Sequence, residues 1–278
     1  MDHYGTMENI KKAFRQFLEN TDEEKGICVL CADNENLREI SKDLPRRVVF
    51  YGMSEDAEYR AAHIAPEGTG VAFDVERDGK KLVRVRLNIP GHHNVLNALG
   101  SVAAGVLCGV SPEKAAEALS LFHGAKRRFE TKGRTAGVWI VDDYAHHPTE
   151  IEATLKAARQ TKPKRLICAF QPHRYSRTQL LQKEFGGAFR DADLLILTDV
   201  YSAGEAPIAG VSGETILAAV EKTTGQKTAY IKARADVAPY LENIVQDGDL
   251  VMTMGAGDIC RTGEELLALL AAREDQKV

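Results

Sequence analysis

Short apolar runs alternate with segments of helical periodicity throughout the second half of the chain. The runs expected to form strands are 138–141, 165–170, 194–200, 228–231 and 250–254. The segments expected to form helices are 148–160, 178–190, 213–223, 234–246 and 262–273. A strand, a helix and a second strand in this order build a βαβ unit, whose two strands run parallel. The pattern therefore predicts an α/β fold with a doubly wound, mostly parallel sheet.

The first half of the chain mixes helix and strand signals. The expected helices are 7–19, 94–108 and 112–122, and the expected strands are 27–31, 48–51 and the two halves of 70–89. Thr6 and Ser111 precede helices as caps, and Asp78-Gly79 supplies a hairpin turn. Apolar and polar residues alternate around that turn, so we expect a half-exposed antiparallel pair.

A basic, turn-like stretch with the sequence HGAKRRF at 123–129 separates the two patterns. We place a domain boundary within it, which gives one α/β domain over 1–127 and a second over 128–278. Two domains are also the default for 278 residues, at roughly 100–200 residues per domain.

Charge and cysteine content narrow the class of protein. The net charge of −4 gives no support for a general nucleic-acid or membrane-surface binder. No apolar run approaches the ~18 residues of a membrane-spanning helix, and the first ten residues lack a signal-peptide pattern. Five scattered cysteines suit a reducing cytoplasm, so we expect a cytoplasmic protein without a nucleic-acid or membrane partner. Cys28 and Cys31 form a C-x-x-C without a second pair, and we expect core strand residues there rather than a zinc site.

Ionisable residues and glycines gather directly after four of the expected strands. The four segments are DDYAHHPTE at 142–150, QPHRYSRT at 171–178, YSAGE at 201–205 and GAGD at 255–258. Ligands of doubly wound sheets bind outside the carboxyl ends of the strands, where these segments are expected to meet. Each segment alone also has a structural explanation, such as a helix start at Pro148 or a glycine turn. Their coincidence on one edge favours a functional site.

The residue types at this edge suit a negatively charged, phosphorylated intermediate. Arg174 and Arg177 are three residues apart and can lie on one helix face, where guanidinium groups grip a phosphate or a carboxylate. His146 and His173 add to an electropositive edge. Such groups stabilise concentrated negative charge and do not suit hydride transfer.

Other polar residues have both a binding and a structural interpretation. Asp142 and Asp143 are candidates to hold a ribose or a hydrated Mg²⁺. Asn94 and Asn97, three apart at a helix start, can read an adenine edge, although Asn94 can equally be the N-cap of that helix. The GAGD segment is half of a dinucleotide fingerprint, which is weak evidence on its own.

Several of these segments occur together in one family. PGHHNVLNA, RRFE, DDYAHHPTE, FQPHRYSRT, YSAGE and GAGD, in this order, resemble the motifs of the Mur ligases, which synthesise the peptidoglycan cell wall. The opening DHYGTMENIKKAF fits the same family, and the similarity runs from about residue 2 to 272. DDYAHHPTE combined with QPHRYSRT is similar to the alanine-adding branch rather than to the tripeptide-adding or later ligases.

The resemblance implies an architecture and a reaction. Residues 1–127 would be the later part of a central ATPase domain, and 128–278 a Rossmann-like carboxyl-terminal domain. With ATP and Mg²⁺, such a ligase phosphorylates the carboxylate of UDP-N-acetylmuramate, and the amine of L-alanine then attacks the acyl phosphate.

The resemblance also implies roles for particular residues. Those expected near the nucleotide are His93, Asn94, Asn97, Arg128 and Asp143. Those expected to bind substrate are Tyr144, His146, His173, Arg174 and Arg177, of which the two histidines and two arginines would be catalytic. No metal ligand is carried over, and Ala145 stands where a glycine is common in the family.

The printed sequence departs from the family in one larger respect. It contains no G-x-x-G-K-[ST] phosphate-binding loop and none of the upstream Mg²⁺ ligands, so we expect a fragment that is inactive alone. One alternative is a non-catalytic nucleotide- or peptide-binding module derived from a Mur ligase. A second alternative, a nicotinamide oxidoreductase, is suggested only by GAGD, and the sequence lacks the complete G-x-G-x-x-G fingerprint of that class.

Overall fold

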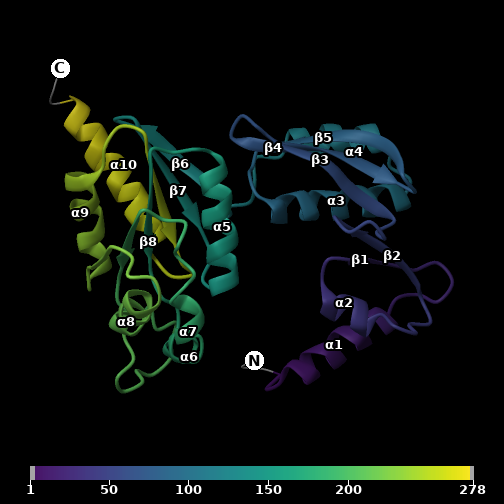
Figure 1. Cartoon of the computed structure of the whole chain (residues 1–278), viewed down its shortest axis with the longest axis horizontal. Coiled ribbons are helices and arrows are strands. Elements are labelled where there is room, and N and C mark those ends of the chain that lie inside the picture. The colour runs from purple at the N-terminus through teal and green to yellow at the C-terminus, as the bar shows by residue number, and fades with distance from the viewer. Residues whose placement is uncertain (1–3, 276–278) are drawn as a thin grey trace. The chain divides into compact units, whose positions relative to one another are not determined.

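The computed structural model describes residues 4–275, which form two compact units with their boundary in the chain between His123 and Gly124 (Figure 1). Each unit has its own sheet and its own hydrophobic core. Asp2 and His3 of the opening motif lie outside the described residues.

The first unit is built on a five-stranded sheet in the order β1-β2-β3-β4-β5. The strands are β1 (Ile27–Cys31), β2 (Arg47–Gly52), β3 (Tyr59–Glu67), β4 (Gly70–Arg77) and β5 (Lys80–Leu87). The first three run parallel, and β3, β4 and β5 continue as an antiparallel meander. The sheet therefore changes from parallel to antiparallel pairing at β3.

Helices cover both faces of this sheet. They are α1 (Met7–Glu19), α2 (Glu35–Ile40), α3 (His92–Leu107) and α4 (Pro112–Ser120). Helices α3 and α4 pack on one face through a core that includes Phe73 and Leu99. Helix α1 packs on the other face of β1 and β2 through Leu18, which contacts the cluster around Cys28. The predicted helix at α1 and its cap at Thr6 are confirmed, since the Thr6 side chain accepts from a backbone N–H of the first turn.

Several expectations for the first unit need correction. Strand β3 and helix α2 carry no strong periodic signal and were not predicted. The hairpin of β4 and β5 is present, but β4 is buried on both faces over most of its length. Phe73 packs in the core on one face, and Asp74 on the other face is covered by its ion pairs with Lys81 and Arg84. Cys28 and Cys31 lie in β1 as predicted, three residues apart and therefore on opposite faces of the strand.

The second unit is built on a six-stranded sheet in the order β10-β9-β8-β11-β7-β6. The strands are β6 (Glu130–Thr135), β7 (Val138–Asp143), β8 (Arg165–Phe170), β9 (Leu194–Leu197), β10 (Thr228–Tyr230) and β11 (Asp249–Met254). All neighbouring pairs are parallel except β6 and β7. The predicted doubly wound, mostly parallel sheet is confirmed, with an antiparallel edge strand, β6, that was not predicted.

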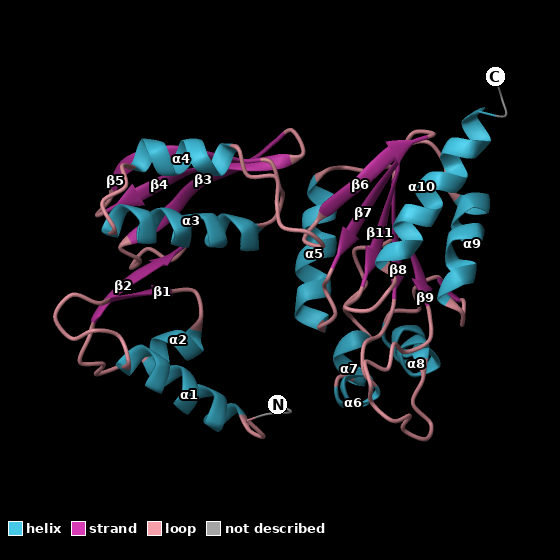
Figure 2. Ribbon diagram, turned by 180° about the vertical axis from the view of Figure 1, so that it is seen from behind, coloured by secondary structure: helices cyan, strands magenta, loops and turns pink. Residues whose placement is uncertain are grey.

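Two layers of helix enclose this sheet (Figure 2). The helices are α5 (Pro148–Gln160), α6 (Tyr175–Leu180), α7 (Gln182–Phe185), α8 (Gly213–Thr223), α9 (Val237–Ile244) and α10 (Cys260–Asp275), with a 3-10 turn at Arg234–Asp236. Helices α5, α7 and α8 pack on one face, and α9 and α10 on the other. One helix was expected over 178–190, but the structure has two shorter ones. Helix α6 begins at Tyr175, and Leu181 separates it from α7.

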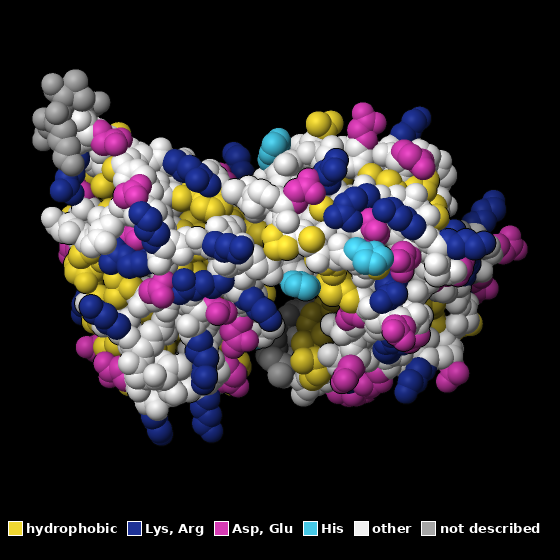
Figure 3. Space-filling model, turned by 45° about the horizontal axis from the view of Figure 1, so that its top comes forward, with side chains coloured by type: hydrophobic (Ala, Val, Ile, Leu, Met, Phe, Trp, Pro, Cys, Tyr) yellow, Lys and Arg dark blue, Asp and Glu magenta, His cyan; other side chains and the backbone are white. Residues whose placement is uncertain are grey.

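The surface is mixed in charge. Acidic and basic side chains are interspersed over the visible face of both units (Figure 3), as the small net charge would suggest. Among the described residues, no helix is both long enough and apolar enough to cross a bilayer.

Candidate active site at the strand ends of the second unit

The carboxyl ends of four strands lie in one row. Asp143 of β7 and Phe170 of β8 both pair with Met254 of β11, and Phe170 also pairs with Leu197 of β9. The segments that follow these residues therefore leave the sheet side by side. This is the convergence that the sequence predicted, and it brings polar residues from three loops within contact distance.

The loop after β9 holds the loop after β8. Tyr201 forms an isolated parallel bridge with His173, in which the Tyr201 N–H donates to the Pro172 carbonyl at 2.8 Å and the Arg174 N–H donates to the Tyr201 carbonyl at 2.9 Å. The rings of His173 and Tyr201 are stacked, with centroids 5.7 Å apart and an interplanar angle of 13°. The orientation of His173 is thus fixed by both backbone and ring contacts. Tyr201 was not among the predicted site residues, and only its place in YSAGE pointed to it.

His173 is a neutral hydrogen-bond donor at pH 7. Burial lowers the pKa of His173 to about 4, with help from the nearby Arg177, His146 and Arg174. The Arg177 Nη1 group lies 3.1 Å from His173 Nδ1 and can only donate, so Nδ1 is the acceptor. The ring proton of neutral His173 is therefore on Nε2, where it can donate to a ligand oxygen.

His146 has the complementary tautomer. Its Nδ1 atom lies 2.9 Å from the Tyr144 carbonyl, which can only accept, so Nδ1 carries the proton. The Nε2 atom of neutral His146 keeps its lone pair and can accept a proton. The two imidazole rings are tilted by 57° to each other, with centroids 6.0 Å apart. One histidine thus offers a donor and its neighbour an acceptor.

Arg174 stands at the start of α6 in an unusual backbone conformation, with φ 70° and ψ 136°. A non-glycine residue at positive φ is strained, and such strain clusters at functional sites. The missing side-chain cap of α6 is replaced by Glu205, which accepts from the Ser176 N–H at 3.1 Å and from its hydroxyl at 2.6 Å. Burial acts to raise the pKa of Glu205, but these hydrogen bonds outweigh it and the pKa is lowered. A charged Glu205 also lies 4.0 Å from the Arg174 guanidinium.

The two aspartates at the end of β7 point into the protein. Asp142 is fully buried and accepts from the Thr253 hydroxyl at 2.7 Å. Asp143 accepts from the backbone N–H groups of Phe129 and Ala145, both at 2.8 Å. The expectation that they hold a ribose or a hydrated Mg²⁺ is therefore not supported, because their oxygens are engaged within the chain. Burial raises the pKa of Asp143 to about 6, against the effect of its two N–H donors.

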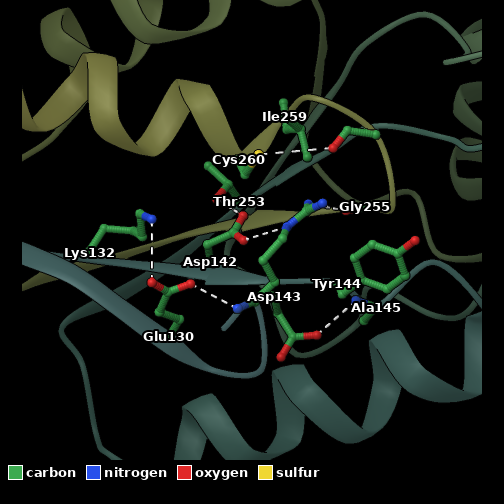
Figure 4. A network of polar contacts seen from close by, with 12 residues as sticks. Glu130, Lys132, Asp142, Asp143, Tyr144, Ala145, Thr253, Gly255, Ile259 and Cys260 are labelled. Carbon is green, nitrogen blue, oxygen red and sulfur yellow. Dashed lines mark hydrogen bonds and ion pairs between the residues drawn. The ribbon is translucent and has the colours of Figure 1, made fainter. Parts of the chain in front are cut away.

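Arg127 is a site residue that the sequence did not single out. Its Nε donates to Asp142 at 3.0 Å and its Nη2 to the Gly255 carbonyl at 2.6 Å. Figure 4 labels these two acceptors. The adjacent Arg128, which the sequence analysis expected near the nucleotide, is exposed, and its guanidinium lies 5.6 Å from the centre of the Tyr144 ring. The basic stretch 123–129 was a visible signal, but it does not distinguish the inward arginine from the outward one.

The remaining nucleotide candidates belong to the first unit. Gly91, with φ 105°, is the N-cap of α3, so Asn94 is not the cap; its side-chain amide donates to the Pro90 carbonyl at 2.7 Å. His93 and Asn97 are exposed at the start of the same helix.

The GAGD segment is packed against Gln171 rather than shaped as an open cradle. Gln171 donates to the Asp258 carboxylate at 2.8 Å and accepts from the Ile259 N–H at 3.1 Å. A Cβ added at Gly257 would lie 2.4 Å from the Gln171 side chain. Close packing thus explains this glycine, and the dinucleotide interpretation loses its only support.

Comparison with known proteins identifies both units. The Mur ligase middle domain matches residues 1–105, and the Mur ligase, glutamate ligase domain matches residues 127–257. The chain is 46% identical over 271 residues to the UDP-N-acetylmuramate–L-alanine ligase of Desulforamulus reducens and 44% identical over 279 residues to that of Pelotomaculum thermopropionicum. It spans 58% and 60% of these two proteins, which in turn match 97% and 100% of the chain.

Solved structures agree on the fold. The UDP-N-acetylmuramate-alanine ligase of Thermotoga maritima superposes with a TM-score of 0.77 at 26% identity, over 97% of this chain and 56% of that one. The MurF ligase of Thermotoga maritima in complex with ADP superposes with a TM-score of 0.73 at 18% identity, over 99% of this chain and 60% of that one. The chain belongs to the Mur ligase family and contains residues of that family's middle and carboxyl-terminal domains.

Proposed function

We propose that the chain forms part of an ATP-dependent ligase that joins L-alanine to UDP-N-acetylmuramate through an acyl phosphate, in cytoplasmic peptidoglycan synthesis. The observation that carries the proposal is the meeting of His146, His173, Arg174 and Arg177 at one strand edge. The names of the two curated relatives support the choice of substrates. We assign 1–127 to the middle domain and 128–278 to the carboxyl-terminal domain.

The chemistry of the site fits an amino acid that attacks an acyl phosphate. The Nε2–H of His173 and the guanidinium groups of Arg174 and Arg177 are donors for carboxylate or phosphoryl oxygens. His146 Nε2 is an acceptor for the proton that the ammonium group must lose before its nitrogen can attack. Each preorganised donor in such a site contributes about 10²–10³ in rate. Tyr144 lies edge-on to His146, with ring centroids 5.4 Å apart, and is placed to shape the amino-acid pocket.

For ATP, we propose that His93, Asn94 and Asn97 contact the adenine from the start of α3. The two amides can pair with a base edge, and the exposure of Asn97 leaves it accessible. Arg128 is a candidate for phosphate contact, whereas Asp143 would act through Phe129 and Ala145 rather than by touching ATP. The residues that the structure describes include no group of three or more side chains suited to a metal ion. We assign no chemical step to Mg²⁺ here.

The test joins this chain to the preceding part of the Desulforamulus reducens relative, because the chain spans 58% of that protein. The chimera is expected to release phosphate from ATP when UDP-N-acetylmuramate and L-alanine are both present. Omitting L-alanine is the matched control. A folded chimera that binds ATP and UDP-N-acetylmuramate but releases no phosphate on adding L-alanine would overturn the proposal and favour a non-catalytic binding module.

A further inference from the structure

Backbone hydrogen bonds of Arg127 attach the first segment of the second unit to its sheet. The Arg127 N–H donates to Glu130 Oε2 at 2.8 Å, and the Arg127 carbonyl accepts from the Tyr144 N–H at 2.7 Å. Arg127 and Phe129 both have positive φ, at 57° and 49°. A non-glycine residue in this conformation needs its surroundings to hold it there. The backbone at Arg127 is therefore strongly constrained.

The Arg127 side chain joins two strand ends. Its guanidinium binds Asp142, which has no exposed surface, and the carbonyl of Gly255, which follows β11 (Figure 4). Thr253 of β11 binds the other oxygen of the same carboxylate. Arg127 thus neutralises a buried charge and bridges β7 and β11 where both strands meet the site.

The same guanidinium begins a row of ring contacts. It lies over the Tyr144 ring at 4.8 Å from the centroid, within the range of a cation–π interaction. Tyr144 then contacts His146 edge-on, and the His146 ring lies next to the His173 ring in a tilted arrangement, with centroids 6.0 Å apart. The row runs from Arg127 to the two histidines without a gap. A shift of the Tyr144 ring would change the support of His146.

We propose that Arg127 is a positioning residue, which fixes the Tyr144 ring and through it orients His146 for the incoming amino acid. The proposal rests on the proposed function, since it concerns the same site, and it adds a residue that does not itself touch the substrate. The competing account is that Arg127 only neutralises Asp142. That account predicts an effect on stability and none on the rings.

The first test uses the 278-residue chain and measures NOEs between the ring protons of Tyr144 and His146. In Arg127→Gln/Asp142→Asn the buried charge is removed with its partner, so the variant is expected to fold, and the ring NOEs should weaken or vanish. Arg134→Gln is the matched control, because Arg134 lies over the Trp139 ring at 4.3 Å, where β7 begins. Arg127→Lys, which keeps the charge but not the planar fork, serves as the second variant if the double substitution does not fold. Unchanged NOEs in a folded variant would overturn the positioning role.

The second test measures kinetics in the chimera described above. Misplacement of a catalytic group by about 1 Å costs roughly 10²-fold. The double variant should therefore lose about ten- to hundredfold in kcat/KM for L-alanine, with an unchanged KM for UDP-N-acetylmuramate and an unchanged control. Normal kcat/KM for L-alanine in the variant would contradict the proposal. An inactive wild-type chimera would count against the proposed function alone, because the NOE measurement still decides the role of Arg127.

Discussion

The two candidate regions of this chain differ in how far their polar side chains are exposed. At the strand ends of the second unit, nearly every polar group is already bonded to another, as in the bridge between His173 and Tyr201 and the buried pair of Arg127 and Asp142. At the start of α3 in the first unit, the Asn97 side chain is exposed. We therefore expect substitutions to affect both stability and the proposed activity in the first region, and the proposed binding alone at Asn97 in the second.

This difference has a physical reason. Groups that stabilise charge in a reaction must be oriented beforehand, because reorganisation at the moment of reaction is costly. Groups that read a base need only project from a rigid helix. The predictions below test whether substitutions in the two regions differ as this comparison requires.

The largest effect is expected for Asp142→Ala. Asp142 is fully buried, and its removal leaves the Arg127 guanidinium without its anion in the interior. Loss of one partner of a buried pair costs about 3–5 kcal/mol. Urea unfolding followed by the fluorescence of Trp139, the single tryptophan, reports on the second unit. Asp247→Ala is the control. The Asp247 side chain pairs with Lys164 but is 76% exposed, so this ion pair should contribute only about 0–1 kcal/mol to the free energy of unfolding.

The second prediction concerns Asp143 and pH. Its pKa is near 3.8 when unfolded and about 6 in the folded protein, so the folded state binds the proton more tightly. The resulting stabilisation is fully present below pH about 4 and is lost as the pH rises through 6. At about 1.4 kcal/mol per pKa unit, the loss is roughly 3 kcal/mol. Comparing wild type with Asp143→Asn between pH 4 and 7 isolates it; parallel stability curves would contradict the assigned pKa.

His173 should show the reverse dependence. Its folded pKa of about 4 lies below the ordinary value of 6.5, so its contribution to stability is present above pH 6.5 and is lost as the pH falls toward 4. An NMR titration of the His173 ring gives the pKa directly. Loss of Arg177, as in Arg177→Gln, should raise that pKa, since burial and Arg177 are its two largest causes. A wild-type value near 6.5 would show that the ring is solvated and not held as described.

The smallest effect on stability is expected for Asn97→Ala. The side chain is exposed on α3, and such substitutions usually change stability by no more than about 0.5 kcal/mol. Loss of one net hydrogen bond to a base would still weaken ATP binding by the chimera, by about two- to tenfold. Calorimetry on the same variant measures both quantities. A large loss of stability would remove the contrast between the two regions.

Periodicity in the sequence was sufficient to predict the sheet of the second unit and the meeting of its polar loops. Strand β6 was missed because Glu130–Thr135 is mostly polar and pairs with one neighbour at the sheet edge. Strand β3 was missed because apolar and polar residues do not alternate regularly in its sequence, YRAAHIAPE. Local sequence gives little signal for strands whose pairing is decided by tertiary contacts.

The individual roles at the site were less accessible to sequence analysis. Asp142 and Asp143 have the composition of a ligand site but are turned inward, and Arg127 and Arg128 differ only in the direction of their side chains. The direction of a side chain depends on the backbone conformation, which at Arg127 has a positive φ. The residue types in RRFE do not predict this conformation.

The most direct test of the account is the steady-state kinetics and melting temperature of Arg174→Ala in the chimera. If the strand ends of the second unit form a preorganised site for the acyl phosphate, kcat per folded molecule should fall by about 10²–10³. If Arg174 only starts helix α6, the variant should melt earlier and retain wild-type kcat per folded molecule. That second result would contradict the catalytic role proposed for the strand ends of the second unit.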